Sequence, residues 1–432
     1  MKTKILILCL FLFSNLKAQI DYFPPLLGNE WDTLSISGLG WCDDQLDELL
    51  VYLEEHNTKA FLILKDGKIV VEKYFGDTDM DTPLAWNSAG KTITSLLVGI
   101  AQEDGLLSIA DRISDYLGTG WTSLPPDKED AITIRHQLTM TTGLNDLNFF
   151  NTNPNALTYV ADAGTRWAYH NAPYTLLTNV IENAADSMSI NTFALLNLKL
   201  QTGMDGLFIP IPLITSEIFY SSARSMARMG SLMLNKGTWD NTVVLGDQDY
   251  FSQMITPSQS INESYGYLWW LNGFDSYIAP GSQQVFPGSL APNAPVDLYM
   301  AAGKDGQFLD IIPSKNLVVI RMGDAPDDDL VPINFHNEMW SYIAALLCES
   351  TATEDLNSLD QMAVFPNPFD EVLYIESDTE IKTIRLYSTI GQVIFEQENV
   401  DQISGKGLAP GIYWLALEDL NHRRIVKKII RN

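Results

Sequence analysis

Hydrophobic positions along the chain follow a helical period in some segments and a strand period in others. Apolar residues recur with a helical spacing over 43–57 and again over 332–348. Between these segments, the pattern is mainly helical from residue 88 to about 260. Two apolar runs around Asp66-Gly67 predict a β-hairpin. Further strand-like runs cover 297–303, 306–313 and 316–323.

This order of elements predicts one sheet whose strands come from distant parts of the sequence. We expect an α/β (α+β) fold, in which an antiparallel sheet is flanked by N- and C-terminal helices and carries an inserted helical domain. A polar linker at 349–362 follows. The short alternating strands of residues 363–432 then predict a small C-terminal all-β sandwich.

Residues 1–18 have the layout of a secretory signal peptide. Lys2 and Lys4 precede an apolar run from Ile5 to Phe13, and a polar stretch ends at Ala18. The apolar run is too short to span a bilayer, and the sequence holds no second run long enough to do so. We therefore expect the main domain, residues 19–348, to be soluble and to lie outside the cytoplasm.

The net charge of the chain bears on which kinds of molecule it can bind. The chain of 432 residues has 54 acidic and 27 basic side chains, a formal net charge of −27. Such a surface repels phosphate backbones, so we expect no nucleic-acid partner. The hydrophobic content of 46% is enough for a large core.

Cysteine usage fits an oxidising compartment. Cys9 leaves with the signal peptide, so Cys42 and Cys348 remain. They lie at the ends of the first and last helical segments of the main domain. Antiparallel packing of those helices would bring the two thiols together and allow a disulfide; the alternative is two separate buried thiols. Two cysteines and five dispersed histidines show no metal-ligand spacing, so we expect no metal site.

Ser88 and Lys91 stand three residues apart at the start of an apolar helix. Positions i and i+3 share a helix face, so the Lys91 amine can reach the Ser88 hydroxyl. Backbone N–H groups at a helix start favour negative charge on that oxygen. Burial lowers the pKa of a lysine and would make Lys91 a base for Ser88. The alternative is an N-cap serine followed by an exposed lysine.

Two later clusters offer complementary groups. Tyr169 to Asn171 provides a phenol that can relay protons and an amide that can hold a substrate carbonyl. Lys304 to Gly306 lies between two strand-like runs, where the glycine would let a substrate lie along the strand edge and the lysine would supply positive charge. The alternative for the second cluster is the tip of an Asp-Gly hairpin.

Three motifs therefore follow one another: Ser88-x-x-Lys91, Tyr169-x-Asn171 and Lys304-x-Gly306. Their order resembles the serine β-lactamase and penicillin-recognising superfamily, and the Tyr-x-Asn form resembles its class C-like branch. The resemblance spans about 43–348 and implies a β-lactamase/transpeptidase-like fold. Flanking blocks are similar to the 6-aminohexanoate-dimer hydrolase and esterase subgroup: "WNSAGKTITSLLVGIA", "TIRHQLTMTTGL", "SARSMARMGSLMLNKGTW" and "YGYLWWLNG".

This resemblance implies a cofactor-independent serine hydrolase that acts on a small-molecule ester, amide or peptide. Ser88 would form an acyl-enzyme, and Lys91 and Tyr169 would share the role of base. The remaining roles concern substrate binding. Asn171 would hold the carbonyl, Lys304 and Gly306 would form the third motif, and the backbone N–H groups of Ser88 and Gln307 would form the oxyanion hole.

One departure from the family pattern bears on the substrate. Asp305 stands where antibiotic-hydrolysing members carry a hydroxyl residue, and its charge would repel a β-lactam carboxylate. We therefore expect ester or amide hydrolysis; the alternatives are a non-catalytic binding protein on the same fold and a true β-lactamase or D-peptidase. Tryptophans near the motifs are expected to wall the pocket or to pack in the core: Trp86, Trp167, Trp269 and Trp270.

The last 70 residues resemble the C-terminal sorting domain of type IX secretion cargo. The features that match are "VFPNPF" at 364–369, "STIGQ" at 388–392, "LAPGIYWL" at 408–415 and the terminal "KKIIRN". The resemblance implies export through the periplasm to the cell surface or the medium, with the type IX machinery as a partner. The alternative is a carbohydrate- or protein-binding β-module.

Overall fold

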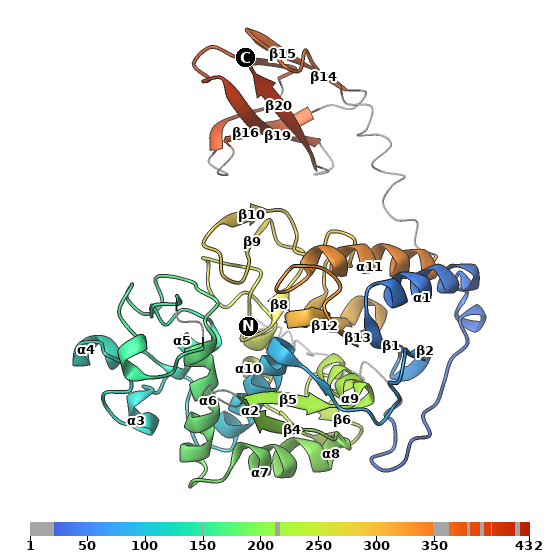
Figure 1. The fold of residues 1–432 in the computed structure, drawn as a ribbon, viewed down its shortest axis with the longest axis vertical. Helices are drawn as coiled ribbons and strands as arrows, with labels where there is room; N and C mark the ends of the chain where they lie inside the picture. Colours follow the sequence, from blue (N-terminus) through green and yellow to red (C-terminus); the bar gives the residue numbers. More distant parts are fainter. Residues whose placement is uncertain are drawn as a thin grey trace, which may run out of the picture.

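The computed structural model describes residues 21–147, 150–211, 217–348, 363–377, 381–388, 393–398, 400–419 and 424–432 (Figure 1). The expected signal peptide, residues 1–18, and the expected linker, residues 349–362, lie outside the described residues. Among the described residues, no helix is long and apolar enough to cross a membrane.

A six-stranded antiparallel sheet forms the centre of the main domain. Its order is β2-β1-β13-β12-β11-β8, so strands from the two ends of the domain lie side by side, as the sequence predicts. The hairpin at Asp66-Gly67 joins the first two strands. The bounds are β1 (Thr58–Lys65), β2 (Lys68–Tyr74), β8 (Trp270–Leu271), β11 (Tyr299–Gly303), β12 (Gln307–Ile312) and β13 (Leu317–Gly323).

Helices cover both faces of this sheet (Figure 1). Consecutive residues of a strand point to opposite faces. The side chain of Leu309 lies against Gly230 of α9 (Ala223–Leu234). The next residue, Asp310, points to the opposite face, where its carboxylate accepts hydrogen bonds from His336 and Trp340 of α11 (Ile333–Leu346). Helix α1 (Leu46–Glu55) packs beside α11. The N- and C-terminal helices therefore share one face and α9 covers the other.

Cys42 and Cys348 form a disulfide. Their Cα atoms lie 5.2 Å apart across a sequence separation of 306 residues. The bond joins the segment before α1 to the end of α11, and the Cys42 N–H also donates to the Leu346 carbonyl. The predicted pairing is confirmed, and the alternative of two free thiols is wrong.

The region between the strands is mainly helical, as expected. Its helices are α2 (Lys91–Glu103), α3 (Ser114–Leu117), α4 (Pro126–Glu129), α5 (Ile134–Leu138), α6 (Asn171–Ala184), α7 (Ile190–Ala194), α8 (Leu200–Thr202) and α10 (Gln248–Met254). Short hairpins complete it: β6 (Thr238–Trp239) with β7 (Thr242–Val243), and β9 (Ser276–Ile278) with β10 (Val285–Pro287).

A small sheet inside this region was not expected from the sequence. It has the order β3-β5-β4, from β3 (Leu84–Ala85), β4 (Leu207–Pro210) and β5 (Glu217–Ser221). The Trp86 N–H continues the pairing by donating to the Phe219 carbonyl at 2.9 Å. The sheet therefore supports the backbone immediately before Ser88.

The C-terminal segment forms two antiparallel sheets around a core of its own, which confirms the predicted sandwich. One sheet has the order β14-β15-β18 and the other β17-β16-β19-β20. The core includes Leu373, Ile384, Leu415 and Ile429. The bounds are β14 (Ala363–Phe365), β15 (Val372–Glu376), β16 (Ile381–Ser388), β17 (Val393–Glu398), β18 (Gln402–Ser404), β19 (Gly411–Asp419) and β20 (Arg424–Arg431).

Candidate active site

Ser88 lies in a 3-10 turn, η3 (Asn87–Gly90), that leads directly into α2. Its side chain is partly exposed, and Lys91 is the first residue of the α-helix. The Lys91 Nζ donates a hydrogen bond to Ser88 Oγ at 2.9 Å. The i, i+3 spacing therefore places the amine against the hydroxyl, as the sequence predicts.

The Lys91 amine is enclosed by aromatic rings. Its side chain is 3% exposed, and Nζ lies 5.0 Å from the ring centre of Tyr169 and 4.3 Å from that of Tyr174. Burial lowers the pKa of Lys91 well below its ordinary value of 10.5, because an ammonium ion loses its hydration there. The alternative of a solvent-exposed lysine is wrong.

Tyr169 completes this cluster from the segment before α6. Its phenol is hydrogen-bonded to Ser88, which lowers the phenol pKa, but burial has the larger effect and raises the pKa above its ordinary value of 10. The ring stacks on Trp270, with centres 5.9 Å apart and planes 20° apart. Trp167 and Tyr265 pack against it at angles of 46° and 84°. These contacts fix the ring, and the phenol stays neutral at physiological pH.

The four tryptophans near the motifs are packing residues. Each is at most 2% exposed, so they offer no free aromatic surface to solvent: Trp86, Trp167, Trp269 and Trp270. Trp86 donates through Nε1 to Ser221 Oγ at 2.7 Å, which ties the approach to Ser88 to β5. Of the two expectations, core packing is the one observed.

Asn171 is the first residue of α6 and is 3% exposed. Its Oδ1 atom finds no hydrogen-bond partner among the described residues. A buried polar atom without a partner is costly, and such atoms are frequent where a substrate or water binds. His170, which precedes Asn171, is also buried.

The third motif lies differently from the prediction. Lys304 to Gly306 form a 3-10 turn, η6, between β11 and β12, in which Asp305 and Gly306 have φ values of 64° and 74°. A methyl group added to Gly306 would meet Arg321 Nη1 at 2.6 Å, not Ser88. The hairpin-tip alternative therefore describes this segment, and Gly306 does not provide the expected strand edge.

Gly303, the last residue of β11, makes the close approach instead. A methyl group added there would lie 2.6 Å from the Trp86 carbonyl oxygen, 2.9 Å from Ala89 N and 3.2 Å from Ser88 N. Strand β8 pairs with β11 only at Tyr299 and Met300. Residues 301–303 pair with β12 on one side, but among the described residues no strand pairs with them on the side of β8. This free edge of β11 ends at Gly303, beside Ser88.

Lys304 points its charge into solvent. Its side chain is 60% exposed and its Nζ lies 3.5 Å from Asp305 Oδ1. Its carbonyl oxygen accepts a hydrogen bond of 2.9 Å from Asn87 Nδ2. Gln307 is buried, and its side-chain amide donates to the Gly323 carbonyl at 2.6 Å. The turn therefore contacts the Ser88 segment through its backbone, and the side-chain amine of Lys304 is paired with Asp305.

Sequence reasoning missed four residues of this site. Tyr174 and Tyr265 surround Lys91 and Tyr169, but nothing in a single sequence separates these tyrosines from the other core aromatics. Gly303 lies three residues before the glycine that the motif suggested. Asn87 adjoins Ser88, yet its contacts reach residues more than two hundred positions away.

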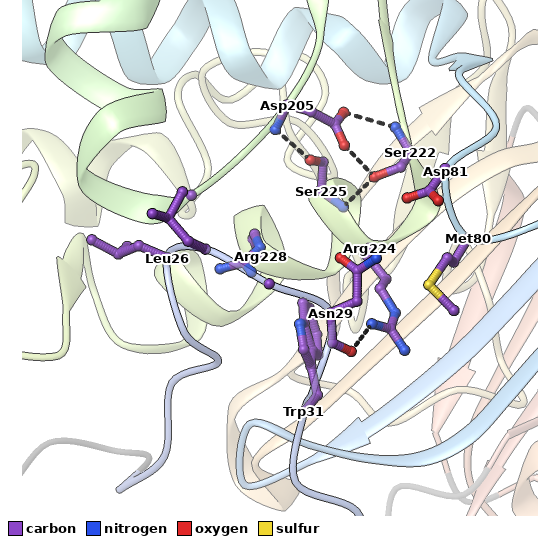
Figure 2. Close-up of a pocket in the computed structure, with 13 residues that line it drawn as sticks. Leu26, Asn29, Trp31, Met80, Asp81, Asp205, Ser222, Arg224, Ser225 and Arg228 are labelled. Carbon is purple, nitrogen blue, oxygen red and sulfur yellow. Dashed lines mark hydrogen bonds between the residues drawn. The ribbon is translucent and has the colours of Figure 1, made fainter.

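Two features outside this cluster bear on a metal centre and on a second pocket. Among the described residues, no group of histidine, cysteine, aspartate and glutamate side chains could hold a metal ion. Figure 2 shows a surface pocket in which Arg224 and Arg228 lie beside Trp31. Arg224 donates to the Asn29 carbonyl and Arg228 to that of Pro25. These arginines anchor the N-terminal segment, and the pocket does not include Ser88.

The sequence matches two family models. Residues 52–330 match the Beta-lactamase family model, and residues 363–432 match the model of the Secretion system C-terminal sorting domain. No curated protein matches the chain in sequence.

Solved structures share the fold at low identity. A protein assigned as a 6-aminohexanoate-dimer hydrolase from Bacillus anthracis has a TM-score of 0.55 and 17% identity, covering 76% of this chain and 88% of that one. A protein assigned as a beta-lactamase from Bacteroides dorei DSM 17855 has a TM-score of 0.57 and 15% identity, covering 71% and 99%. A family VIII carboxylesterase has a TM-score of 0.52 and 14% identity, covering 70% and 98%.

These likenesses confirm the expected fold, and the family model covers more than half of the sequence. This chain belongs to the beta-lactamase family and carries a C-terminal sorting domain of a secretion system.

Proposed function

We propose that this chain is an exported serine hydrolase that cleaves ester or amide bonds through an acyl-enzyme on Ser88. The observation that carries the proposal is the contact of 2.9 Å between Lys91 Nζ and Ser88 Oγ, in a cluster that also holds Tyr169. The Tyr-x-Asn form of the second motif favours the class C-like branch of the family.

The pKa directions favour Lys91 as the base. A lysine whose pKa is lowered by burial is neutral at lower pH than usual and can accept the Ser88 proton. Tyr169 has a raised pKa and stays protonated, so it suits a proton relay. The Ser88 oxygen then bonds to the substrate carbonyl carbon, and Lys91 returns the proton, with Tyr169 as relay, to the departing alkoxide or amine. A water molecule then attacks the carbonyl carbon of the acyl-enzyme and gives a proton to the same base. The bond to Ser88 Oγ breaks, the base returns the proton to that oxygen, and the acid product leaves.

Two backbone N–H groups would stabilise the oxyanion of each tetrahedral intermediate. Ser88 supplies the first. Because Gly303 lies beside Ser88 N, we assign the second to Lys304, the residue after Gly303, in place of Gln307. We assign the orientation of the substrate to Asn171, because its buried side-chain oxygen has no hydrogen-bond partner among the described residues.

The charges around the site favour an uncharged substrate. Burial lowers the pKa of Lys91 and so disfavours its charged form, and the Lys304 side chain is exposed and paired with Asp305. Neither side chain is set to bind a carboxylate, so we infer that esters and short amides are preferred over β-lactams. The C-terminal sorting domain supports export, and we infer that the type IX machinery carries it out.

Hydrolysis of p-nitrophenyl esters by the purified protein tests this function, with short amide oligomers, D-amino-acid peptides and cephalosporins as the comparison panel. We expect ester hydrolysis by the wild type and a loss of about 10⁴-fold or more in Ser88→Ala. Equal rates in the two proteins would refute the proposal. Cell fractionation of a strain in which residues 363–432 are deleted tests export: the truncated protein should remain in the periplasm.

A further inference from the structure

The Lys304–Gly306 turn is held by side chains from two sides. On one side, Asn87 Nδ2 donates to the Lys304 carbonyl at 2.9 Å and lies 3.3 Å from Asp305 Oδ2. On the other side, Arg321 Nη1 donates to the carbonyl of Asp305 at 2.5 Å and to that of Gly306 at 3.0 Å. All three carbonyl groups of the turn therefore accept a side-chain hydrogen bond.

Arg321 is an unusual anchor because its guanidinium is fully buried. It donates through Nη2 to the carbonyls of His56 and Asp324, at 2.7 and 3.0 Å, and through Nε to Thr58 Oγ1 at 3.1 Å. Every N–H direction of the planar group thus has an acceptor. Such a rigid fork fixes the turn against the loops around residues 56 and 324.

Gly306 and Gly323 fit closely around this guanidinium. A methyl group added to Gly306 would meet Nη1 at 2.6 Å, and one added to Gly323 would meet Nη2 at 2.8 Å. The site of the arginine is therefore built by backbone from both η6 and β13. This explains why the third motif ends in a glycine although that glycine does not face Ser88.

Asn87 anchors the turn from the side of the nucleophile. It directly precedes Ser88 and has a φ of 49°, in the left-handed region that asparagine tolerates better than most residues. In this conformation its side chain leaves the Ser88 turn and reaches η6. One residue thus connects the segment that carries Ser88 with the segment that carries the Lys304 N–H.

We propose that Asn87 is a positioning residue whose amide, opposed by Arg321 on the far side of the turn, sets the gap between the Ser88 and Lys304 N–H groups. The inference rests on the proposed function, because the gap matters only if an oxyanion forms there. The Lys304 carbonyl belongs to the planar peptide unit after the Lys304 Cα atom and the Lys304 N–H to the unit before it, so the hydrogen bond from Asn87 acts on the N–H across that single Cα atom. The backbone donor is thereby held in place without a basic side chain.

The variant Asn87→Gly tests this directly, since glycine keeps the left-handed backbone and removes only the amide. We expect kcat for a p-nitrophenyl ester to fall roughly 10- to 100-fold, the scale of a misplaced oxyanion donor. KM should change little, because the oxyanion contact forms in the transition state. Asn316→Gly is the matched control: Asn316 has a φ of 47° and donates to Asp66 Oδ1 at 2.9 Å, remote from Ser88. Its kcat should stay at the wild-type value.

Exchanging the amide of Asn87 and the carboxylate of Asp305 gives a second test. Its readout is a coupling between the two substitutions in kcat, which a loss of stability would not produce. Asn87→Asp places a carboxylate against Asp305 and should lower kcat further than Asn87→Gly. Adding Asp305→Asn restores a donor and an acceptor between the two side chains but no donor to the Lys304 carbonyl, so kcat should recover only to about the level of Asn87→Gly, a coupling typical of contacting residues.

Three results would overturn the inference: wild-type kcat in Asn87→Gly, the same loss in Asn316→Gly, or independent effects of Asn87→Asp and Asp305→Asn. Ser88→Ala is measured in parallel. If Ser88→Ala retains activity, the proposed function itself fails; if it is inactive while Asn87→Gly is normal, only the positioning role fails.

Discussion

The amine of Lys91 lies where water cannot solvate an ammonium ion. Its neighbours are the rings of Tyr169 and Tyr174 and the hydroxyl of Ser88, and burial alone accounts for its lowered pKa. Burial therefore favours the neutral form of the lysine, which a base requires, and this burial lowers the stability of the fold. Such a conflict between stability and function is typical of active-site residues.

The pH dependence of kcat/KM follows from this lowered pKa. Activity requires neutral Lys91, so kcat/KM should rise with pH and reach half of its plateau well below pH 10.5. A pH profile of ester hydrolysis measures this limb. Lys91→Ala should lose roughly 10²- to 10⁴-fold across the profile. A half-maximum near pH 10.5 would contradict the account.

Lys91 should also destabilise the folded protein at neutral pH. Its folded pKa lies below its unfolded value, so between the two values the unfolded chain binds more protons, and the free energy of unfolding rises with pH. Lys91→Met should therefore unfold at higher temperature than the wild type at pH 7, with a difference that shrinks toward pH 10.5. Lys304→Met, at an exposed lysine, should show no such gain. A lower unfolding temperature for Lys91→Met at pH 7 would refute this prediction.

At the scale of elements, the close contact between β11 and η3 decides the geometry of the site. Gly303 has a φ of −134°, which any residue can adopt, so the space around it is what excludes a side chain. A methyl group there would push the strand end away from the Ser88 turn.

Gly303→Ala should therefore lower kcat by about 10²-fold and destabilise the protein by roughly 1–3 kcal/mol. Gly230→Ala is the matched control, because its methyl group would meet Val318 Cγ1 at 2.3 Å in the core, away from Ser88. The control should lose stability while its kcat stays at the wild-type value. Ester kinetics and thermal unfolding measure both quantities; equal kcat losses would contradict the role of Gly303.

Much of this architecture could be predicted from the sequence because the signals were local. The 43–57 helix, the Asp66-Gly67 hairpin and the late strands each follow a clear period, and the i, i+3 spacing alone places Lys91 near Ser88. The third motif could not be placed, because Lys304-x-Gly306 fits a strand edge and a hairpin tip equally well. Only the packing of Gly303 and Gly306 against residues far along the chain separates the two.

At the scale of the whole molecule, the Cys42–Cys348 disulfide encloses almost the entire main domain. It joins residues 306 positions apart, and α1 and α11 pack beside each other next to it. In the unfolded chain such a crosslink removes much conformational freedom.

Replacing both cysteines by serine should lower the free energy of unfolding by about 2–4 kcal/mol. Urea unfolding of the Cys42→Ser/Cys348→Ser variant measures the loss. A reductant should shift the midpoint of the wild type toward that of the variant and leave the variant unchanged. An unchanged midpoint in the variant would show that the bond contributes little to stability.

The central claim is that Ser88 is the nucleophile. Treatment of the folded protein with a fluorophosphonate probe, followed by peptide mass spectrometry, tests it most directly, because this reagent captures a serine only when a base and oxyanion donors activate it. The account predicts a single adduct on Ser88 that is absent in Ser88→Ala and strongly slowed in Lys91→Ala. An unlabelled Ser88 in the folded wild-type protein, or an adduct on another residue, would contradict it.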